Sequence, residues 1–225
     1  MKKKVFFGFI FLISGLVNAQ IIDNYGLRIG AGFSNQYWDY KNEMFSDLSS
    51  WKKDKLSLSI YLNAEKKLNN FLSIRPEIGY IQKGFNDDII FTTAEGEQID
   101  TDIKDVILHN LSGNIGLKIS PVDFIVKPYL IAGIRGDYMI DYKDFEVEVQ
   151  GVKYGLYKST IDDFNKFTLS GLIGIGLDYK SLVYIDFEFN PAFTKNLDDT
   201  GISIKDRYYG LSIGLNINTL IKKSE

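Results

Sequence analysis

Apolar and polar residues alternate with a period of two in eight separate stretches of this chain. In residues 25–34, the odd positions are apolar or aromatic and the even positions carry glycine, arginine and serine. Successive side chains of a β-strand point to opposite faces, so each stretch predicts a strand with one apolar and one polar face. Helical spacing fits none of the stretches better. The predicted strands are residues 25–34, 56–65, 72–80, 107–118, 124–138, 167–178, 183–190 and 209–217.

The gaps between these strands are alternately long and short. Residues 35–55 follow the first strand and residues 139–164 follow the fifth, whereas only a few residues follow the second, fourth and sixth. Bacterial outer-membrane barrels have short periplasmic turns and longer extracellular loops. The pattern therefore predicts an all-β fold, an eight-stranded antiparallel up-and-down transmembrane β-barrel with both termini in the periplasm. Residues 145–149 alternate again before Gly151, which predicts that strands five and six continue above the membrane as a hairpin.

Alternation alone leaves open which face meets the outside. A soluble, lipocalin-like barrel would turn its apolar face inward around a ligand. Two features favour the membrane: each apolar face covers about ten residues, the length that a tilted strand needs to cross a bilayer, and the polar face is crowded with glycine, which suits a narrow lumen. These glycines are Gly26, Gly30, Gly32, Gly174, Gly176, Gly210 and Gly214.

The predicted lumen carries six charges of each sign. A barrel of eight strands is only wide enough for its own side chains to fill it, and an unpaired buried charge costs several kcal/mol. We therefore expect a packed core of ion pairs, with an ion pathway or an acid–base carboxylate pair as the alternative. The charges are Arg28, Arg75, Lys83, Lys118, Lys127 and Arg135, and Glu65, Glu77, Asp137, Asp178, Asp186 and Glu188.

The beginning of the chain predicts export. Lys2–Lys4 form a positive region, residues 5–16 are apolar, and Ala19 ends a possible cleavage site. The apolar run is shorter than the roughly 20 residues of a spanning helix, so residues 1–19 predict a cleaved signal peptide. Residues 20–225 then form one barrel domain.

Composition excludes several kinds of chemistry. Without cysteine there is no lipid attachment, disulfide or thiol chemistry, and one histidine excludes Cys/His zinc sites. Removing three lysines with the signal peptide changes the formal charge from −3 to −6. The basic excess that nucleic-acid binding requires is absent. We predict no cofactor, no metal and no nucleic-acid partner.

No catalytic residues are predicted. The glycine motifs lie within strands and lack the helix that phosphate binding needs. His109 is the one histidine, and its position in the alternation places it on the lipid-facing side near the outer rim. Ser112 has the opposite parity and faces the lumen, so the two cannot form the simple pair that an outer-membrane lipid hydrolase would use. An outer-leaflet lipid-modifying enzyme remains an alternative function.

The predicted loops have individual compositions. The second is acidic, and its spacing matches no calcium loop, so a solvated loop is favoured over a cation site. The first is aromatic, which indicates part of an outer aromatic girdle or, if it protrudes, a partner surface. The acidic residues are Asp87, Asp88, Glu95, Glu97, Asp100, Asp102 and Asp105, and the aromatic residues are Tyr37, Trp38, Tyr40, Phe45 and Trp51.

Three segments resemble the PorT-like outer-membrane β-barrel family. They are Leu72–Gly84, with Pro-Glu before an apolar stretch and Gln-Lys-Gly, Lys127–Gly133, and the Gly-x-Gly strand Phe167–Tyr179. The resemblance covers the strands and none of the loops. It implies an outer-membrane barrel, and the founding member's part in assembling a secretion system implies an accessory secretion role as one alternative. Such barrels usually end on an aromatic residue, whereas here the chain continues into Thr219–Glu225.

The sequence thus predicts an integral protein of the outer membrane, of structural or interaction type and not an enzyme. Its specificity would lie in the extracellular loops. The predicted partners are membrane lipid and lipopolysaccharide, with an envelope or secretion protein binding through loops 35–55 and 139–164.

Overall fold

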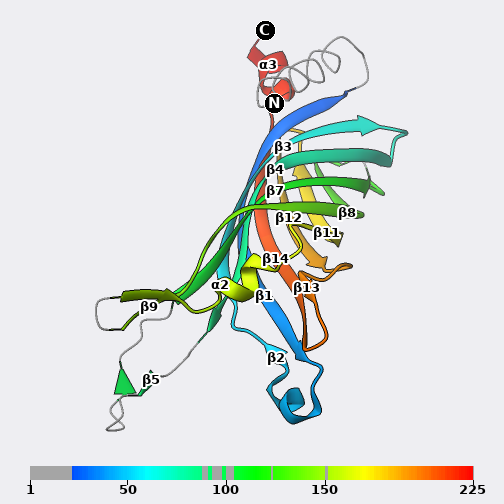
Figure 1. Ribbon diagram of the computed structural model, residues 1–225. Helices are drawn as coiled ribbons and strands as arrows, with labels where there is room; N and C mark the ends of the chain where they lie inside the picture. The colour runs from blue at the N-terminus through cyan, green and yellow to red at the C-terminus, as the bar shows by residue number, and fades with distance from the viewer. Residues whose placement is uncertain are drawn as a thin grey trace, which may run out of the picture.

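The computed structural model describes residues 22–87, 91–92, 98–99, 104–122, 124–149 and 152–224. Eight long antiparallel strands follow one another around a barrel, and the last pairs with the first, so the sheet is closed (Figure 1). Closure leaves no free strand edge among them. The strands are β1 (Asn24–Tyr40), β3 (Lys55–Lys67), β4 (Leu72–Asp87), β7 (Lys104–Ile119), β8 (Val126–Lys143), β11 (Phe167–Tyr179), β12 (Val183–Pro191) and β14 (Ile202–Asn216). The predicted fold class is confirmed, whereas residues 1–19 lie outside the described residues.

The shorter elements lie at the two ends of the barrel. At the extracellular end, shown at the bottom of Figure 1, the loops carry several short elements, and at the periplasmic end the helix α3 (Ile217–Ser224) follows β14. The extracellular elements are η1 (Glu43–Leu48), β2 (Ser50–Trp51), β5 (Phe91–Thr92), β6 (Gln98–Ile99), β9 (Glu146–Val149), β10 (Val152–Gly155), α2 (Lys158–Asp162) and β13 (Leu197–Asp198).

Among the described residues, no helix has the length and apolar character needed to cross a membrane.

The predicted hairpin above strands five and six is only partly right. β9 and β10 do pair, but as a separate two-stranded sheet, and α2 lies between β10 and β11. The Asp144 carboxylate explains why β9 and β10 do not simply continue β8 and β11. It accepts hydrogen bonds from the N–H groups of Phe145 at 2.7 Å and Tyr157 at 3.1 Å, and so joins the two ends of the excursion.

The outward face of the barrel is apolar over a continuous belt. One residue from each long strand illustrates it, and all of them are exposed: Ile29, Leu62, Ile78, Ile115, Leu130, Ile173, Ile185 and Leu211. Aromatic girdles border the belt, with Tyr25, Phe71, Phe124 and Tyr179 at the periplasmic end and Phe33, Tyr138, Phe167 and Phe193 at the outer end. Because the neighbouring inward positions are charged and buried, this barrel has the orientation of a membrane protein and not that of a lipocalin.

Above the outer girdle the wall reverses its polarity. Inward positions there are apolar and buried, whereas outward positions are charged. The reversal follows from the surroundings, since the outer solvent at this height is water and no longer lipid. The inward residues are Trp38, Phe85, Val106, Leu108 and Ile204, and the outward ones include Asp39, Asp141, Lys143 and Lys205.

The turn between β11 and β12 is short, with three residues, 180–182, between the paired residues Tyr179 and Val183. Lys180 and Ser181 both have left-handed backbone angles, with φ of 54° and 53°, and the Leu182 N–H donates to the Tyr179 carbonyl at 2.9 Å. Such turns match the twist of paired strands and usually carry Asn-Gly. The predicted short periplasmic turn is therefore present, with unfavourable residues at both of its central positions.

Candidate functional site

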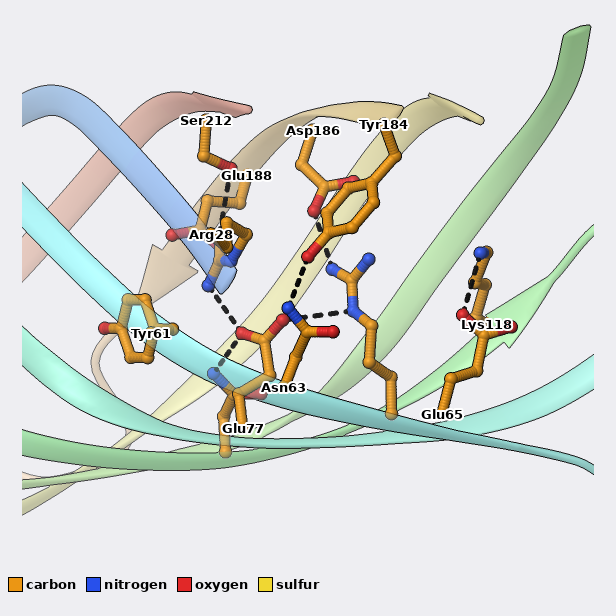
Figure 2. Close-up of polar contacts among 12 residues, drawn as sticks. Arg28, Tyr61, Asn63, Glu65, Glu77, Lys118, Tyr184, Asp186, Glu188 and Ser212 are labelled. Carbon is orange, nitrogen blue, oxygen red and sulfur yellow. Dashed lines mark hydrogen bonds and ion pairs between the residues drawn. The ribbon is translucent and has the colours of Figure 1, made fainter. Parts of the chain in front are cut away.

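Arg28 is the centre of an ion-pair network inside the lumen (Figure 2). Its guanidinium contacts the Glu77 carboxylate at 2.5 Å and the Glu188 carboxylate at 3.0 Å, donates to Ser212 Oγ at 3.0 Å, and lies 4.5 Å from the centre of the Tyr61 ring. These partners come from four different strands. One buried side chain thus joins opposite walls of the barrel.

Two further arginines extend this network along the lumen. Arg75 contacts Asp186 at 2.7 Å and Glu77 at 3.1 Å, and Arg135 donates to the Tyr61 hydroxyl at 2.5 Å. Arg135 also lies 3.4 Å from Glu188. Because Glu77 is shared between Arg28 and Arg75, and Glu188 between Arg28 and Arg135, the charges neutralise one another inside the lumen.

The network continues to both ends of the lumen. Lys118 contacts Glu65 at 3.0 Å and Asp178 at 3.3 Å at the periplasmic end. Lys83 contacts Asp137 at 2.6 Å near the outer end. Eleven of the twelve predicted lumen charges are buried, and Lys127, at the periplasmic rim, is only half-buried. The predicted packing of ion pairs is confirmed for the eleven.

Tyrosines fill the lumen space beside the glycines, and the sequence reasoning did not assign them this role. A Cβ at Gly214 would lie 1.9 Å from the Tyr184 ring, and one at Gly176 would lie 2.3 Å from the Tyr129 ring. The Tyr184 hydroxyl accepts a hydrogen bond from Asn63 at 2.6 Å. Gly214 and Gly176 each leave room for an aromatic ring from the neighbouring strand, which explains the glycine at these two positions of the polar face.

An apolar cluster closes the lumen at its outer mouth. We call it the outer plug, and it consists of Trp38, Phe85, Val106, Leu108, Phe145, Tyr157, Ile161, Phe164 and Ile204. The rings of Trp38, Phe85 and Tyr157 pack edge to face, with centres 5.1 to 5.6 Å apart. Burial and a hydrogen bond to Asp87 raise the pKa of Tyr157. The segment around α2 thus covers the mouth with side chains that exclude water.

The lumen differs at its periplasmic end. There it widens into a cavity of about 490 Å³ whose lining includes Glu65, Lys118 and Asp178. Ion pairs and tyrosines fill the barrel above this cavity, and the outer plug closes the other end. Among the described residues, the lumen is therefore a vestibule at its periplasmic end that the ion pairs and the outer plug separate from the outside.

The aromatic residues of the first loop divide into two groups. Trp38 is only 4% exposed and belongs to the outer plug, so it is wrong to place it in a girdle or on a protruding patch. Trp51 is exposed, its ring lies 5.2 Å from Tyr37, and the Arg207 guanidinium lies 4.0 Å above it. Phe45 is exposed on η1.

The helix η1 carries the most exposed apolar side chains of the extracellular surface. Met44 is 81% exposed and Leu48 is 60% exposed, and Asn42 caps the helix by accepting a hydrogen bond from the Met44 N–H at 2.9 Å. The helix is held in place, since the Tyr40 N–H donates to Ser49 Oγ at 2.8 Å across its base. The loop therefore presents a small, ordered apolar tip.

His109 and Ser112 lie on opposite faces of β7, as predicted. His109 faces outward, where its Nδ1 bonds the Tyr80 hydroxyl and its ring stacks on Tyr80 with centres 6.0 Å apart. Ser112 is buried in the lumen. They form no catalytic pair.

Only part of the acidic second loop can be placed. Asp87 contacts Lys52 at 2.5 Å, while Asp88, Glu95, Glu97, Asp100 and Asp102 lie outside the described residues. In the parts of the chain with assigned positions, no three histidine or acidic side chains gather closely enough to hold a metal ion.

The family of the protein follows from its sequence. Residues 18–198 match the family described as outer membrane protein beta-barrel domain. The chain belongs to this family. The apolar belt of this outer membrane protein therefore lies in the outer membrane. No curated protein matches the sequence. The match is to the broad family, so the PorT-like resemblance stays a prediction.

Several solved structures are similar to this outer membrane barrel. Ail of Yersinia pestis is 12% identical over 86% of this chain and 100% of its own, with a TM-score of 0.37. Neisserial surface protein A is 12% identical over 84% and 96%, with a TM-score of 0.42. The N-terminal β-barrel domain of Pseudomonas aeruginosa OprF is 10% identical over 84% and 96%, with a TM-score of 0.35. These similarities concern the fold alone.

Proposed function

We propose that this protein is a non-conducting outer-membrane barrel that acts through its extracellular surface, as a structural or interaction protein. The observation that carries the proposal is the outer plug above a filled lumen. A path for solute would have to displace both an apolar cluster and a set of shared ion pairs. The extracellular loops are then the part of the protein that can contact a partner outside the cell.

Loop 35–55 offers the best-defined contact surface. Its η1 tip exposes Met44, Phe45 and Leu48, and exposed apolar side chains at such a position favour contact with another protein. Loop 139–164 contributes Phe145, Tyr157, Ile161 and Phe164 to the outer plug, and it also contains β9 and β10. We expect an envelope or surface protein to bind here, and membrane lipid and lipopolysaccharide to surround the barrel.

Conductance measurements test the closed lumen. The mature chain, residues 20–225, should give no discrete conductance steps when it is inserted in a planar bilayer. Trp38→Ala combined with Phe85→Ala removes the centre of the outer plug and serves as the comparison. Stable steps with the unmodified chain would refute the proposal.

Photo-crosslinking in intact cells tests the contact surface. A photoreactive residue at Met44 should give a discrete protein adduct, whereas one at the lipid-facing Leu62 should give lipid adducts only. Trp38 is unsuitable as a probe because it is buried. Adducts at Met44 with lipid or glycan alone would contradict a protein partner.

The identity of the adduct also separates the alternatives. A secretion component captured at Met44, with impaired export in a deletion strain, would favour the accessory role that the PorT-like segments imply. A lipid-modifying enzyme would instead change the lipid A or phospholipid profile on deletion. The separation of His109 and Ser112 argues against this last role.

A further inference from the structure

The helix α3 at the end of the chain has one apolar side. Ile217, Leu220 and Ile221 have the spacing i, i+3 and i+4, which places them together on a helix. All three are exposed, Leu220 by 44% and Ile221 by 49%. At 100° per residue, Thr219 falls on the opposite side. The apolar side is therefore exposed on the surface of the helix.

Asn218 fixes this helix to the point where the barrel closes. Its Nδ2 donates to the Asp23 carbonyl at 2.6 Å, and its Oδ1 accepts a hydrogen bond from the Tyr25 N–H at 3.3 Å. Asn218 lies about 100° around the helix from Ile217. Since the side that bears Asn218 faces the start of β1, the apolar side of α3 lies about a quarter turn away from this contact.

The apolar side continues the lipid-facing belt. Leu211, Ile213 and Leu215 point outward along β14 and are exposed, and Ile217 is the next residue of that row. Tyr25 belongs to the periplasmic aromatic girdle. The exposed side chains of α3 therefore begin at the height where the membrane belt ends.

We propose that α3 lies in the periplasmic leaflet of the outer membrane, with its apolar side at the boundary of headgroups and acyl chains. The sequence continues with lysines at positions 222 and 223, and lysines next to an apolar helical segment favour anionic phospholipid headgroups. The proposal rests on the outer-membrane location and is independent of the extracellular function proposed above. A short interfacial helix thus follows the last strand of the barrel.

Site-specific labelling tests the position of α3, because the chain contains no cysteine. The mature variants Leu220→Cys and Thr219→Cys are labelled with a polarity-sensitive fluorophore and folded into phosphatidylethanolamine–phosphatidylglycerol vesicles. The label at position 220 should emit at a shorter wavelength than the label at position 219. Lipids that carry a nitroxide on the headgroup should quench the fluorescence of the label at position 220 at least about twofold more than that of the label at position 219. Ile213→Cys is the reference inside the belt, and heat-modifiable gel mobility confirms that each barrel is folded.

Two results would overturn the position. Water-like emission at both 219 and 220 would place α3 away from the membrane. A blue-shifted label at 220 that lipid nitroxides do not quench would show that protein, such as a second copy of the chain, covers the apolar side.

A charge variant tests the headgroup preference. Lys222→Gln with Lys223→Gln should reduce the quenching at position 220 in vesicles that contain phosphatidylglycerol, and should change it little in phosphatidylcholine vesicles. Equal quenching of the unmodified helix in both kinds of vesicle would overturn the role of the lysines.

Discussion

Replacing Arg28 by methionine should destabilise the barrel strongly. Arg28 is fully buried, and the change removes the nearest cation from Glu77, at 2.5 Å, and from Glu188, at 3.0 Å. Methionine fills much of the volume but leaves excess negative charge in the lumen. Breaking a buried ion pair in this way costs about 3–5 kcal/mol. We expect a loss of that size in the free energy of unfolding, measured by guanidinium titration of the barrel in lipid vesicles.

Two further variants separate charge imbalance from lost packing. Arg28→Met with Glu77→Gln restores the charge balance, because Arg75 keeps Asp186 as a partner, at 2.7 Å. This double variant should therefore be more stable than Arg28→Met alone. Lys195→Gln removes an exposed ion pair with Asp198 and should leave the unfolding transition unchanged. If Arg28→Met behaves like Lys195→Gln, or the double variant is less stable than the single one, the reasoning about the lumen is refuted.

Three other substitutions test separate parts of the structure by the same titration. Trp38→Ala should lower the free energy of unfolding by about 3–5 kcal/mol because it leaves a cavity in the outer plug. A decrease of less than about 1 kcal/mol would show that the side chains of the outer plug are not closely packed. Gly214→Ala should cost about 1–3 kcal/mol through its clash with the Tyr184 ring, and Tyr184→Ala in the same chain should recover part of that loss; no recovery would contradict the steric account. Lys180→Asn with Ser181→Gly should stabilise the barrel by about 1 kcal/mol, because both positions have positive φ, and no gain would mean that the turn is not strained.

The sequence predicts the membrane-spanning half of the barrel well. Lipid outside and a narrow lumen inside impose opposite polarities on neighbouring residues, so strict alternation marks each strand. Arg28 between Leu27 and Ile29 shows this pattern, and the structure places Arg28 in the lumen and Ile29 in the belt. Strand pairing and the inward charges follow from the same rule.

The extracellular half could not be predicted in this way. Alternation continues to the ends of the strands, but the polarity of each face is reversed above the girdle. Val106 and Leu108 have the parity of lumen residues but are apolar and buried, so the rule of one apolar and one polar face does not describe this part of β7. Tyr157, one of the ring partners of Trp38, comes from the loop that follows β8 much later in the chain, and no local pattern reveals that contact.

This reversal also explains why the strands of the chain are informative about the fold and uninformative about the function. Below the outer girdle both faces of each strand are constrained. Outward residues must be compatible with lipid, and inward residues must fit the close packing of charges such as Arg28 and Glu77. A change on either side costs stability, so little of this region is free to bind a partner. Above the girdle the outward face is solvated, and the loops contribute to stability mainly through the few side chains that enter the outer plug. Residues such as Met44, which contact neither lipid nor plug, carry no such constraint. We therefore propose that any specificity of this barrel lies in the residues that its folding constrains least.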